Sequence, residues 1–111
     1  MKKITVMGLG DIGLPTAITL AGAGFEVCGF DVTERVIESL RGGKIHIVEP
    51  GLQEAFDKAV EGGHLHFSGE LSPADVFYIA VPTPFYQDEN GAHRADLRFV
   101  ESAGRMAGKV I

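Results

Sequence analysis

The segment KKITVMGLGDIGLPTAITLAGAG (residues 2–24) constrains the fold more than any other part of the chain. A short apolar run with β-branched residues, over residues 4–7, leads directly into a G-x-G-x-x-G motif at Gly8, Gly10 and Gly13. Apolar residues with helical spacing follow at once. A glycine-rich turn between a buried strand and a helix is the arrangement in which this motif indicates dinucleotide binding.

Each of the three glycines has a separate physical role in such a turn. Gly8 permits the tight turn, Gly10 lets a pyrophosphate approach the backbone, and Gly13 lets the helix pack closely against the strand. The first turn of the helix offers free N–H groups and a partial positive charge to an anion. We therefore expect the pyrophosphate to lie against Gly8, Gly10, Asp11, Ile12 and Gly13.

An acidic residue follows at the position that the motif requires. Asp31 ends a second apolar run over residues 27–30 and lies 18 residues after Gly13. A carboxylate at the end of the second strand accepts hydrogen bonds from the adenosine ribose, and it would repel a 2′-phosphate. The pattern therefore favours NAD over NADP. The alternative is that Asp31 only caps the helix that follows it.

The rest of the chain alternates between short apolar runs and amphipathic segments. We expect helices at 34–40, 52–60 and 96–109, strands at 65–67 and 75–81, and a loop at 82–95. Alternation of this kind predicts the α/β class, with a Rossmann-like parallel sheet and helices on both faces. The final residues, KVI, resemble the start of another strand. We therefore expect residues 1–111 to form an NAD-binding Rossmann domain, the truncated half of a doubly wound domain.

The run at 75–81 is apolar almost throughout, which predicts a strand that is covered on both faces and lies beside the first strand. The V-P-T-P sequence at its end would then face the nicotinamide half of the cofactor. Thr83 is the polar residue placed to contact the nicotinamide ribose. The alternative, a plain Pro-Thr-Pro turn, is equally compatible with the spacing.

Composition excludes several other classes of function. The formal charge is −5 and no basic stripe with interleaved aromatic residues occurs, so we expect no nucleic-acid partner. No apolar run approaches the ~20 residues of a membrane span. Cys28 is the only cysteine, so no disulfide forms within the chain, and a cytoplasmic location is expected. His64 and His66 share a strand face without a third ligand nearby in the sequence, so we expect no metal site.

Five segments together give a more specific signal: GLGDIGLPTA, GFDV, IHIVEPGL, AVPTPF and DLRFVESA. Their sequences and their order resemble the UDP-glucose/GDP-mannose dehydrogenase family, and IHIVEPGL is most similar to the branch that acts on UDP-N-acetylmannosamine. The resemblance implies an NAD-dependent oxidation of a nucleotide-sugar alcohol, in two steps, to a carboxylate. It also implies a homo-oligomeric full-length enzyme, in which later parts of the chain bind most of the UDP-sugar.

The family resemblance implies no catalytic residue within these 111 residues. The cysteine that holds the reaction intermediate, and the lysine that assists it, belong to later parts of such enzymes. Cys28 lies inside the second predicted strand and is expected to be a structural thiol. Two other hypotheses remain: the cofactor domain of a 2-hydroxyacid or 6-phosphogluconate-type dehydrogenase, and a stand-alone NAD-sensing module without enzymatic activity.

One residue departs from the family pattern. Asp11 stands where the family usually has a tyrosine, next to the expected pyrophosphate. An unpaired carboxylate there would repel the phosphates, whereas a carboxylate that capped the helix would point aside.

Overall fold

The protein is described by a computed structural model, which covers the chain except for a few short segments. The described residues are 2–47, 49–80, 85–87, 93–95 and 98–108.

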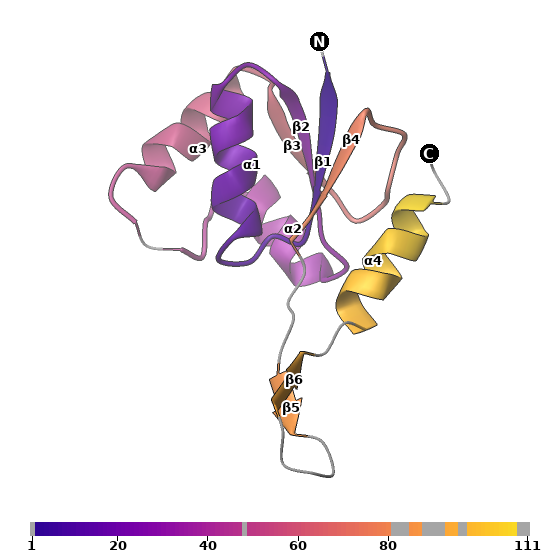
Figure 1. Cartoon of the computed structure of the whole chain (residues 1–111). Coiled ribbons are helices and arrows are strands. Elements are labelled where there is room, and N and C mark those ends of the chain that lie inside the picture. Colours follow the sequence, from indigo (N-terminus) through magenta and orange to yellow (C-terminus); the bar gives the residue numbers. More distant parts are fainter. Residues whose placement is uncertain (1, 48, 81–84, 88–92, 96–97, 109–111) are drawn as a thin grey trace.

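A four-stranded parallel sheet forms the centre of the molecule (Figure 1). Its strands are β1 (Lys3–Met7), β2 (Glu26–Phe30), β3 (Leu65–Ser68) and β4 (Val76–Ile79), in the order β3-β2-β1-β4. The chain therefore builds outward from β1 to β3 and then returns to place β4 on the other side of β1. This order confirms the predicted Rossmann-like sheet, with β4 beside the first strand. The strand order reverses between β1 and β4, and open α/β sheets bind ligands at such a point.

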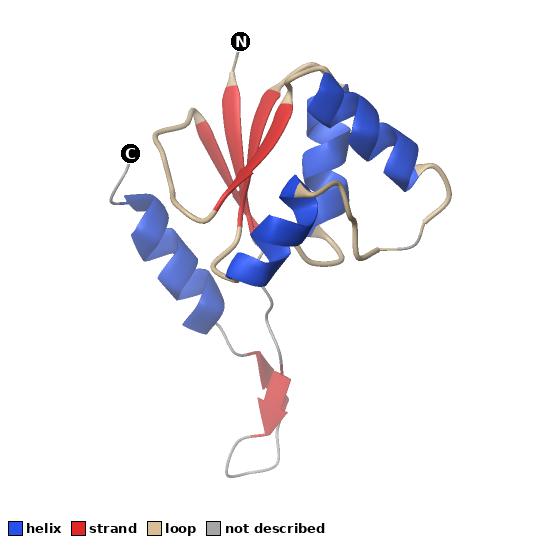
Figure 2. Ribbon diagram, turned by 180° about the vertical axis from the view of Figure 1, so that it is seen from behind, coloured by secondary structure: helices blue, strands red, loops and turns tan. Residues whose placement is uncertain are grey.

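Helices cover both faces of the sheet, as predicted. They are α1 (Gly13–Gly22), α2 (Glu34–Arg41), α3 (Leu52–Glu61) and α4 (Arg98–Gly108). The first three contribute to one hydrophobic cluster and α4 contributes to another. Figure 2, which views the molecule from behind, shows α4 on the opposite side of the strands from α1 and α3.

The register of the sheet explains the larger cluster. Ile4 pairs with Val27 and Val6 with Gly29, and side chains on alternate residues of a strand point to the same face. This face is the one covered by α1, α2 and α3. The buried members of the larger cluster are Ile4, Val6, Leu9, Leu14, Ala17, Ile18, Ala21, Val27, Ile37, Leu40, Leu52, Phe56, Ala59, Leu65 and Phe67.

Gly29 makes room for an aromatic side chain in this cluster. A Cβ atom at position 29 would lie 2.7 Å from Cδ1 of Phe67. Because position 29 has no side chain, Phe67 lies over the sheet and stacks with Phe56, with the ring centroids 5.8 Å apart. The packing of this face therefore requires glycine at position 29.

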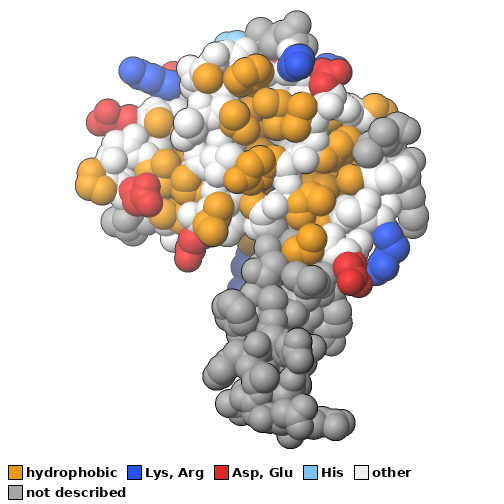
Figure 3. Space-filling model, in the orientation of Figure 1, with side chains coloured by type: hydrophobic (Ala, Val, Ile, Leu, Met, Phe, Trp, Pro, Cys, Tyr) orange, Lys and Arg blue, Asp and Glu red, His pale blue; other side chains and the backbone are white. Residues whose placement is uncertain are grey.

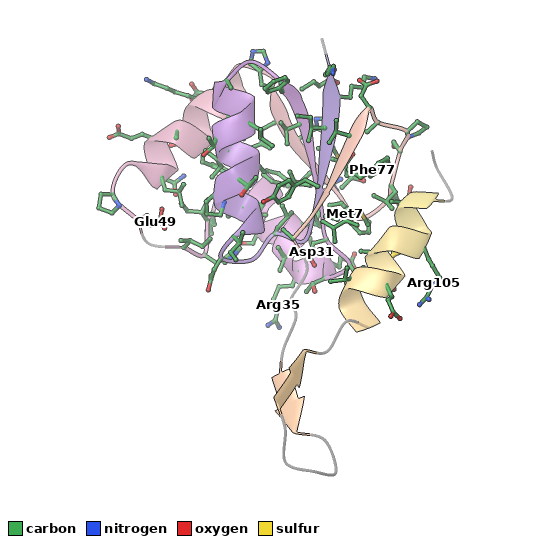
Figure 4. The ribbon with its side chains drawn as sticks, in the orientation of Figure 1. Met7, Asp31, Arg35, Glu49, Phe77 and Arg105 are labelled. Atoms are coloured by element: carbon green, nitrogen blue, oxygen red, sulfur yellow. The ribbon has the colours of Figure 1, made fainter. Side chains whose placement is uncertain are left out.

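The smaller cluster holds α4 against the other face. Met7 and Phe30 are buried there together with Ala103 and Ala107 of α4. Figure 4 shows Met7 and Phe77 on the side of the strands that faces α4. Leu71 and Met106 complete this cluster, which has far fewer buried members than the one beneath α1.

Two expectations about the second half of the chain were wrong. Strand β4 is not covered on both faces, because Val76, Tyr78 and Ile79 are exposed and, among the described residues, only β1 pairs with it. Figure 3 shows apolar side chains gathered on the molecular face in front of α1 and β4. The expected loop at 82–95 contains an antiparallel hairpin formed by β5 (Phe85–Gln87) and β6 (His93–Ala95).

The hairpin extends from the edge of the sheet at which β1 and β4 end (Figure 1). Its first strand begins Phe85-Tyr86, and aromatic residues favour extended pairing over an open loop.

Of the helices in the described part of the chain, none combines the length and the apolar character needed to cross a bilayer.

Helix α4 contains a glycine that no packing requires. A Cβ atom at Gly104 would meet nothing within 4 Å, and glycine in a helix interior costs about 1 kcal/mol relative to alanine. We expect Gly104→Ala to raise the free energy of unfolding by about 0.5–1 kcal/mol, measured by urea denaturation. Gly29→Ala is the matched control and should lower it, because its Cβ would collide with Phe67. A Gly104→Ala variant no more stable than the parent would contradict this account.

Candidate functional site

The glycine-rich turn joins β1 to α1 at the carboxyl edge of the sheet. Gly8 has a φ of +98°, which only glycine adopts readily, and its N–H donates a hydrogen bond to the Phe30 carbonyl at 2.8 Å. A Cβ atom at Gly13 would collide with the carbonyl oxygen of Gly8. The first and third glycines of the motif therefore have the geometric roles that the sequence predicts for them.

The amino terminus of α1 is open to a ligand. Ile12 occupies the N-cap position and forms no side-chain hydrogen bond to the helix, and the first turn holds no acidic residue. Asp11 therefore does not cap α1. The first N–H groups of any α-helix lack acceptors within the helix, so this end can bind an anion. A Cβ atom at Gly10 would meet nothing within 4 Å, so the backbone here borders open space.

Asp31 connects the end of β2 to this turn. Its Oδ2 accepts a hydrogen bond from the Leu9 N–H at 2.9 Å, and its Oδ1 accepts one from the Thr33 N–H at 2.9 Å. Thr33 is the N-cap residue of α2 but forms no side-chain cap. Asp31 therefore orders the start of α2 and also fixes the glycine-rich turn, so its role is wider than capping alone.

A pocket of about 550 Å³ lies where these groups meet. It brings together five of the predicted site residues, namely Gly8, Gly10, Asp11, Ile12 and Asp31. Gly13 does not line the pocket, because it faces the carbonyl of Gly8. Thr83 lies outside the described residues, and Ala80 lines the pocket just beyond the end of β4.

Sequence analysis missed the remaining walls of the pocket. Met7 and Phe30 line it at the ends of β1 and β2, and Ser102, Ala103 and Met106 line it from α4. The spacing of Ala103 and Met106 places them on one helix face, which is a signal that the sequence does carry. Nothing in the sequence, however, says that this face borders a cavity.

The described lining of the pocket offers groups that can bind a dinucleotide. Among its described lining residues, only Asp11, Asp31, Thr33 and Ser102 carry polar side chains, and none of these is paired with a histidine, cysteine or lysine. An anion-binding helix end, a carboxylate and an apolar wall fit the pyrophosphate, the ribose and the base of a dinucleotide.

Other polar groups lie away from the pocket. His46 and Glu49, which flank the IHIVEPG turn, are exposed and do not line it, and Figure 4 shows Glu49 on the α3 side of the molecule, well away from Asp31. Cys28 lies within β2 and is half-buried. Burial raises the pKa of the Cys28 thiol, and the nearby positive charge of Arg41 lowers it by less.

Comparisons with known proteins agree with this geometry. The model of the "UDP-glucose/GDP-mannose dehydrogenase family, NAD binding domain" matches residues 2–111. The UDP-N-acetyl-D-mannosamine dehydrogenase of Yersinia pestis is 46% identical over 110 residues, which are 99% of this chain and 25% of the relative. The NDP-N-acetyl-D-galactosaminuronic acid dehydrogenase of Ralstonia nicotianae is 43% identical over 110 residues, with the same coverage.

Solved structures give the same result. The UDP-N-acetyl-mannosamine dehydrogenase of Staphylococcus aureus superposes with a TM-score of 0.90 at 40% identity, over 98% of this chain and 26% of that one. The GDP-mannose dehydrogenase of Pseudomonas aeruginosa gives a TM-score of 0.84 at 34% identity, over 97% and 24%. The chain thus spans about a quarter of the length of these relatives.

The position of Cys28 predicts an alkaline effect on stability. Because the pKa of its thiol is higher in the folded chain, the unfolded chain loses this proton first as pH rises. The thiol therefore contributes fully to the free energy of unfolding below the ordinary cysteine pKa of about 8.5. This contribution is lost as the pH rises through the higher pKa of the folded chain. We expect Cys28→Ala to flatten the fall in unfolding free energy between about pH 8 and 10, measured by urea denaturation. Parallel curves for the two proteins would contradict the assignment.

Proposed function

The chain belongs to the UDP-glucose/GDP-mannose dehydrogenase family, and on that premise we propose that it is the NAD-binding part of an enzyme that oxidises a nucleotide-sugar alcohol to a carboxylate. The favoured reaction converts UDP-N-acetylmannosamine to UDP-N-acetylmannosaminuronate, because several of the similar relatives carry the corresponding name. Since the chain spans a quarter of those relatives, the activity of the whole protein is inferred from them.

The observation that carries the proposal is the position of Asp31 beside the glycine-rich turn, in the same pocket. The N–H groups at the start of α1 would bind the pyrophosphate together with Gly8 and Gly10. Each oxygen of Asp31 accepts one backbone N–H, and a carboxylate has about four acceptor sites. Acceptor capacity therefore remains for the hydroxyl groups of the adenosine ribose.

The other half of the cofactor would extend toward the end of β4. Ala80 lines the pocket there, and its N–H donates to the Met7 carbonyl at 2.8 Å, so the backbone after β4 is held beside the turn. Thr83, three residues further along, is our candidate for contact with the nicotinamide ribose. Bound NAD would supply the hydride acceptor for the oxidation.

This part of the enzyme holds and orients the cofactor. Among the described lining residues, the hydroxyl groups of Thr33 and Ser102 have no histidine, cysteine or lysine beside them in the lining to activate them. The raised pKa of the half-buried Cys28 favours its protonated, unreactive thiol. We therefore assign no catalytic residue to it and expect the UDP-sugar to be bound mainly by other parts of the protein. A homo-oligomeric, cytoplasmic enzyme of polysaccharide biosynthesis, without a nucleic-acid partner, belongs to the same proposal.

The two alternative hypotheses are less well supported. A 2-hydroxyacid or 6-phosphogluconate-type dehydrogenase would share only the first strand, turn and helix, whereas the match to this family extends over residues 2–111. A stand-alone NAD-sensing module would bind the same cofactor, but the similar relatives are dehydrogenases about four times as long as this chain.

The test of the proposal is a calorimetric titration of the chain with NAD and with NADP. We expect binding of NAD and much weaker binding of NADP, because the Asp31 carboxylate would repel a 2′-phosphate. Asp31→Asn should weaken NAD about tenfold or more, since hydrogen bonds to charged groups contribute about 1.5–3 kcal/mol, and it should narrow the preference for NAD. Equal affinity of the parent chain for the two cofactors would refute the role of Asp31.

Asp11 gives a second prediction. Asp11 is exposed, lines the pocket and does not cap α1, so its carboxylate would repel a pyrophosphate bound there. We expect Asp11→Tyr to tighten NAD binding about fivefold, corresponding to about 1 kcal/mol for one charge at 4 Å in water. Asp11→Asn is the matched control, since it removes the charge without adding a ring and should reproduce most of the gain.

The gain should also shrink as salt is added, because exposed charges are screened. An unchanged affinity in both variants would show that Asp11 points away from the phosphates.

A further inference from the structure

We propose that Phe67 is a positioning residue for Asp31 and thereby sets part of the preference for NAD over NADP. Its ring and the missing side chain of Gly29 form a socket for Leu9, and the N–H of Leu9 holds the Asp31 carboxylate. The inference rests on the proposed function, because it requires that the pocket binds NAD. It concerns a side chain outside the described lining of the pocket.

Leu9 connects the carboxylate to the hydrophobic core. Its N–H donates to Oδ2 of Asp31 at 2.9 Å. Its side chain is only 1% exposed and belongs to the larger hydrophobic cluster. Because the backbone and the side chain of one residue move together, the packing of the Leu9 side chain decides where its N–H points.

The socket for Leu9 is formed around Gly29. A Cβ atom at position 29 would lie 3.0 Å from Cδ2 of Leu9 and 2.7 Å from Cδ1 of Phe67, so both side chains lie over this glycine. Gly29 belongs to β2, two residues before Asp31, and pairs with Phe67 of β3. The socket is therefore built on the same strand that leads to Asp31.

Phe67 is held in place from two sides. Its ring stacks on the ring of Phe56, with the centroids 5.8 Å apart and the planes inclined by 16°. Its carbonyl accepts hydrogen bonds from Nε and Nη2 of Arg41, at 3.1 Å and 2.8 Å. Protein cores are close-packed, so a smaller side chain at position 67 would leave space into which Leu9 can shift.

A shift of Leu9 would release one oxygen of the carboxylate. Oδ1 of Asp31 would still accept the N–H of Thr33 at 2.9 Å, whereas Oδ2 would lose the N–H of Leu9. A carboxylate with one anchor is less well preorganised for the ribose hydroxyl groups, so NAD should bind more weakly. It can also turn away from a 2′-phosphate, and repulsion falls with distance, so NADP should lose less affinity.

The phosphate end of the turn has a separate anchor. The N–H of Gly8 donates to the carbonyl of Phe30 at 2.8 Å, and neither group lies in the socket. The pyrophosphate contacts, which NAD and NADP share, should therefore be affected equally for the two cofactors. The effect of Phe67 is expected in the ratio of the two affinities.

The test compares two variants that each remove one ring of the same stack. Phe67→Leu and Phe56→Leu both replace a buried phenylalanine, but only Phe67 borders the socket of Leu9. We expect Phe67→Leu to lower the ratio of the NADP and NAD dissociation constants about fivefold by calorimetry, and Phe56→Leu to change it less than about twofold. A loss of stability alone leaves this ratio unchanged, because the folded chain binds both cofactors. Equal changes in both variants would overturn the inference.

Exchange of single amide hydrogens, followed by NMR without cofactor, measures the positioning directly. We expect Phe67→Leu to speed exchange of the Leu9 N–H about tenfold and to leave the Gly8 N–H unchanged, because only the first depends on the socket. Phe56→Leu should accelerate neither. Unchanged exchange at Leu9, or equal acceleration at Leu9 and Gly8, would overturn the inference.

The outcomes separate the two proposals. If the parent chain binds neither cofactor, the proposed function and the inference both fail. If the parent chain prefers NAD and Phe67→Leu keeps that preference, the proposed function stands and the inference fails.

A second pair of variants decides if Phe67→Leu does not fold. Leu9→Val and Leu14→Val each shorten a buried leucine of the same cluster, but only Leu9 bonds to Asp31. A lower ratio in Leu9→Val alone would support the inference, and equal changes in both variants would overturn it.

Discussion

The close approach of α1 to β1 is the constraint on which the rest of the structure depends. Any side chain at position 13 would lie on the carbonyl oxygen of Gly8, so α1 can begin at the carboxyl edge of the sheet only because Gly13 is glycine. That start directs the first N–H groups of the helix toward the pocket. It also lets Leu14, Ala17 and Ile18 pack in the main cluster. One missing side chain thus fixes the anion-binding end of the site and the alignment of the larger core.

Asp31 carries a second constraint, because it serves the fold and the proposed site at once. Its two hydrogen bonds, to the N–H groups of Leu9 and Thr33, join the turn after β1 to the turn after β2. The carboxylate is therefore held in place before any ligand arrives, and a preorganised acceptor costs little entropy on binding. A change at Asp31 alters the shape of the glycine-rich turn as well as the ribose contact, so the two effects are separable only with isosteric variants.

The features that could be predicted from the sequence are those encoded by residues close together in the chain. The first strand, turn, helix and Asp31 depend on residues close together in the chain, and the strand and helix periods differ clearly there. Burial of β4 depends on what lies beside it, which an apolar run does not encode, so its exposed Tyr78 was not foreseen. The hairpin within residues 82–95 was not predicted, because the Pro and Gly residues of this segment favour a loop. The contact of α4 with the pocket is tertiary, and Thr83 remains a prediction.

The two ends of the pocket rest on different parts of the core. The glycine-rich turn is anchored to the large cluster through the buried Leu9 and Leu14, whereas the wall formed by α4 rests on the small cluster around Phe30 and Ala103. Local stability follows the number of buried apolar contacts. The end that would bind phosphate is therefore the more rigid one and sets the orientation of a ligand. The apolar end has fewer buried contacts, so it contributes apolar surface to a ligand rather than fixing its orientation.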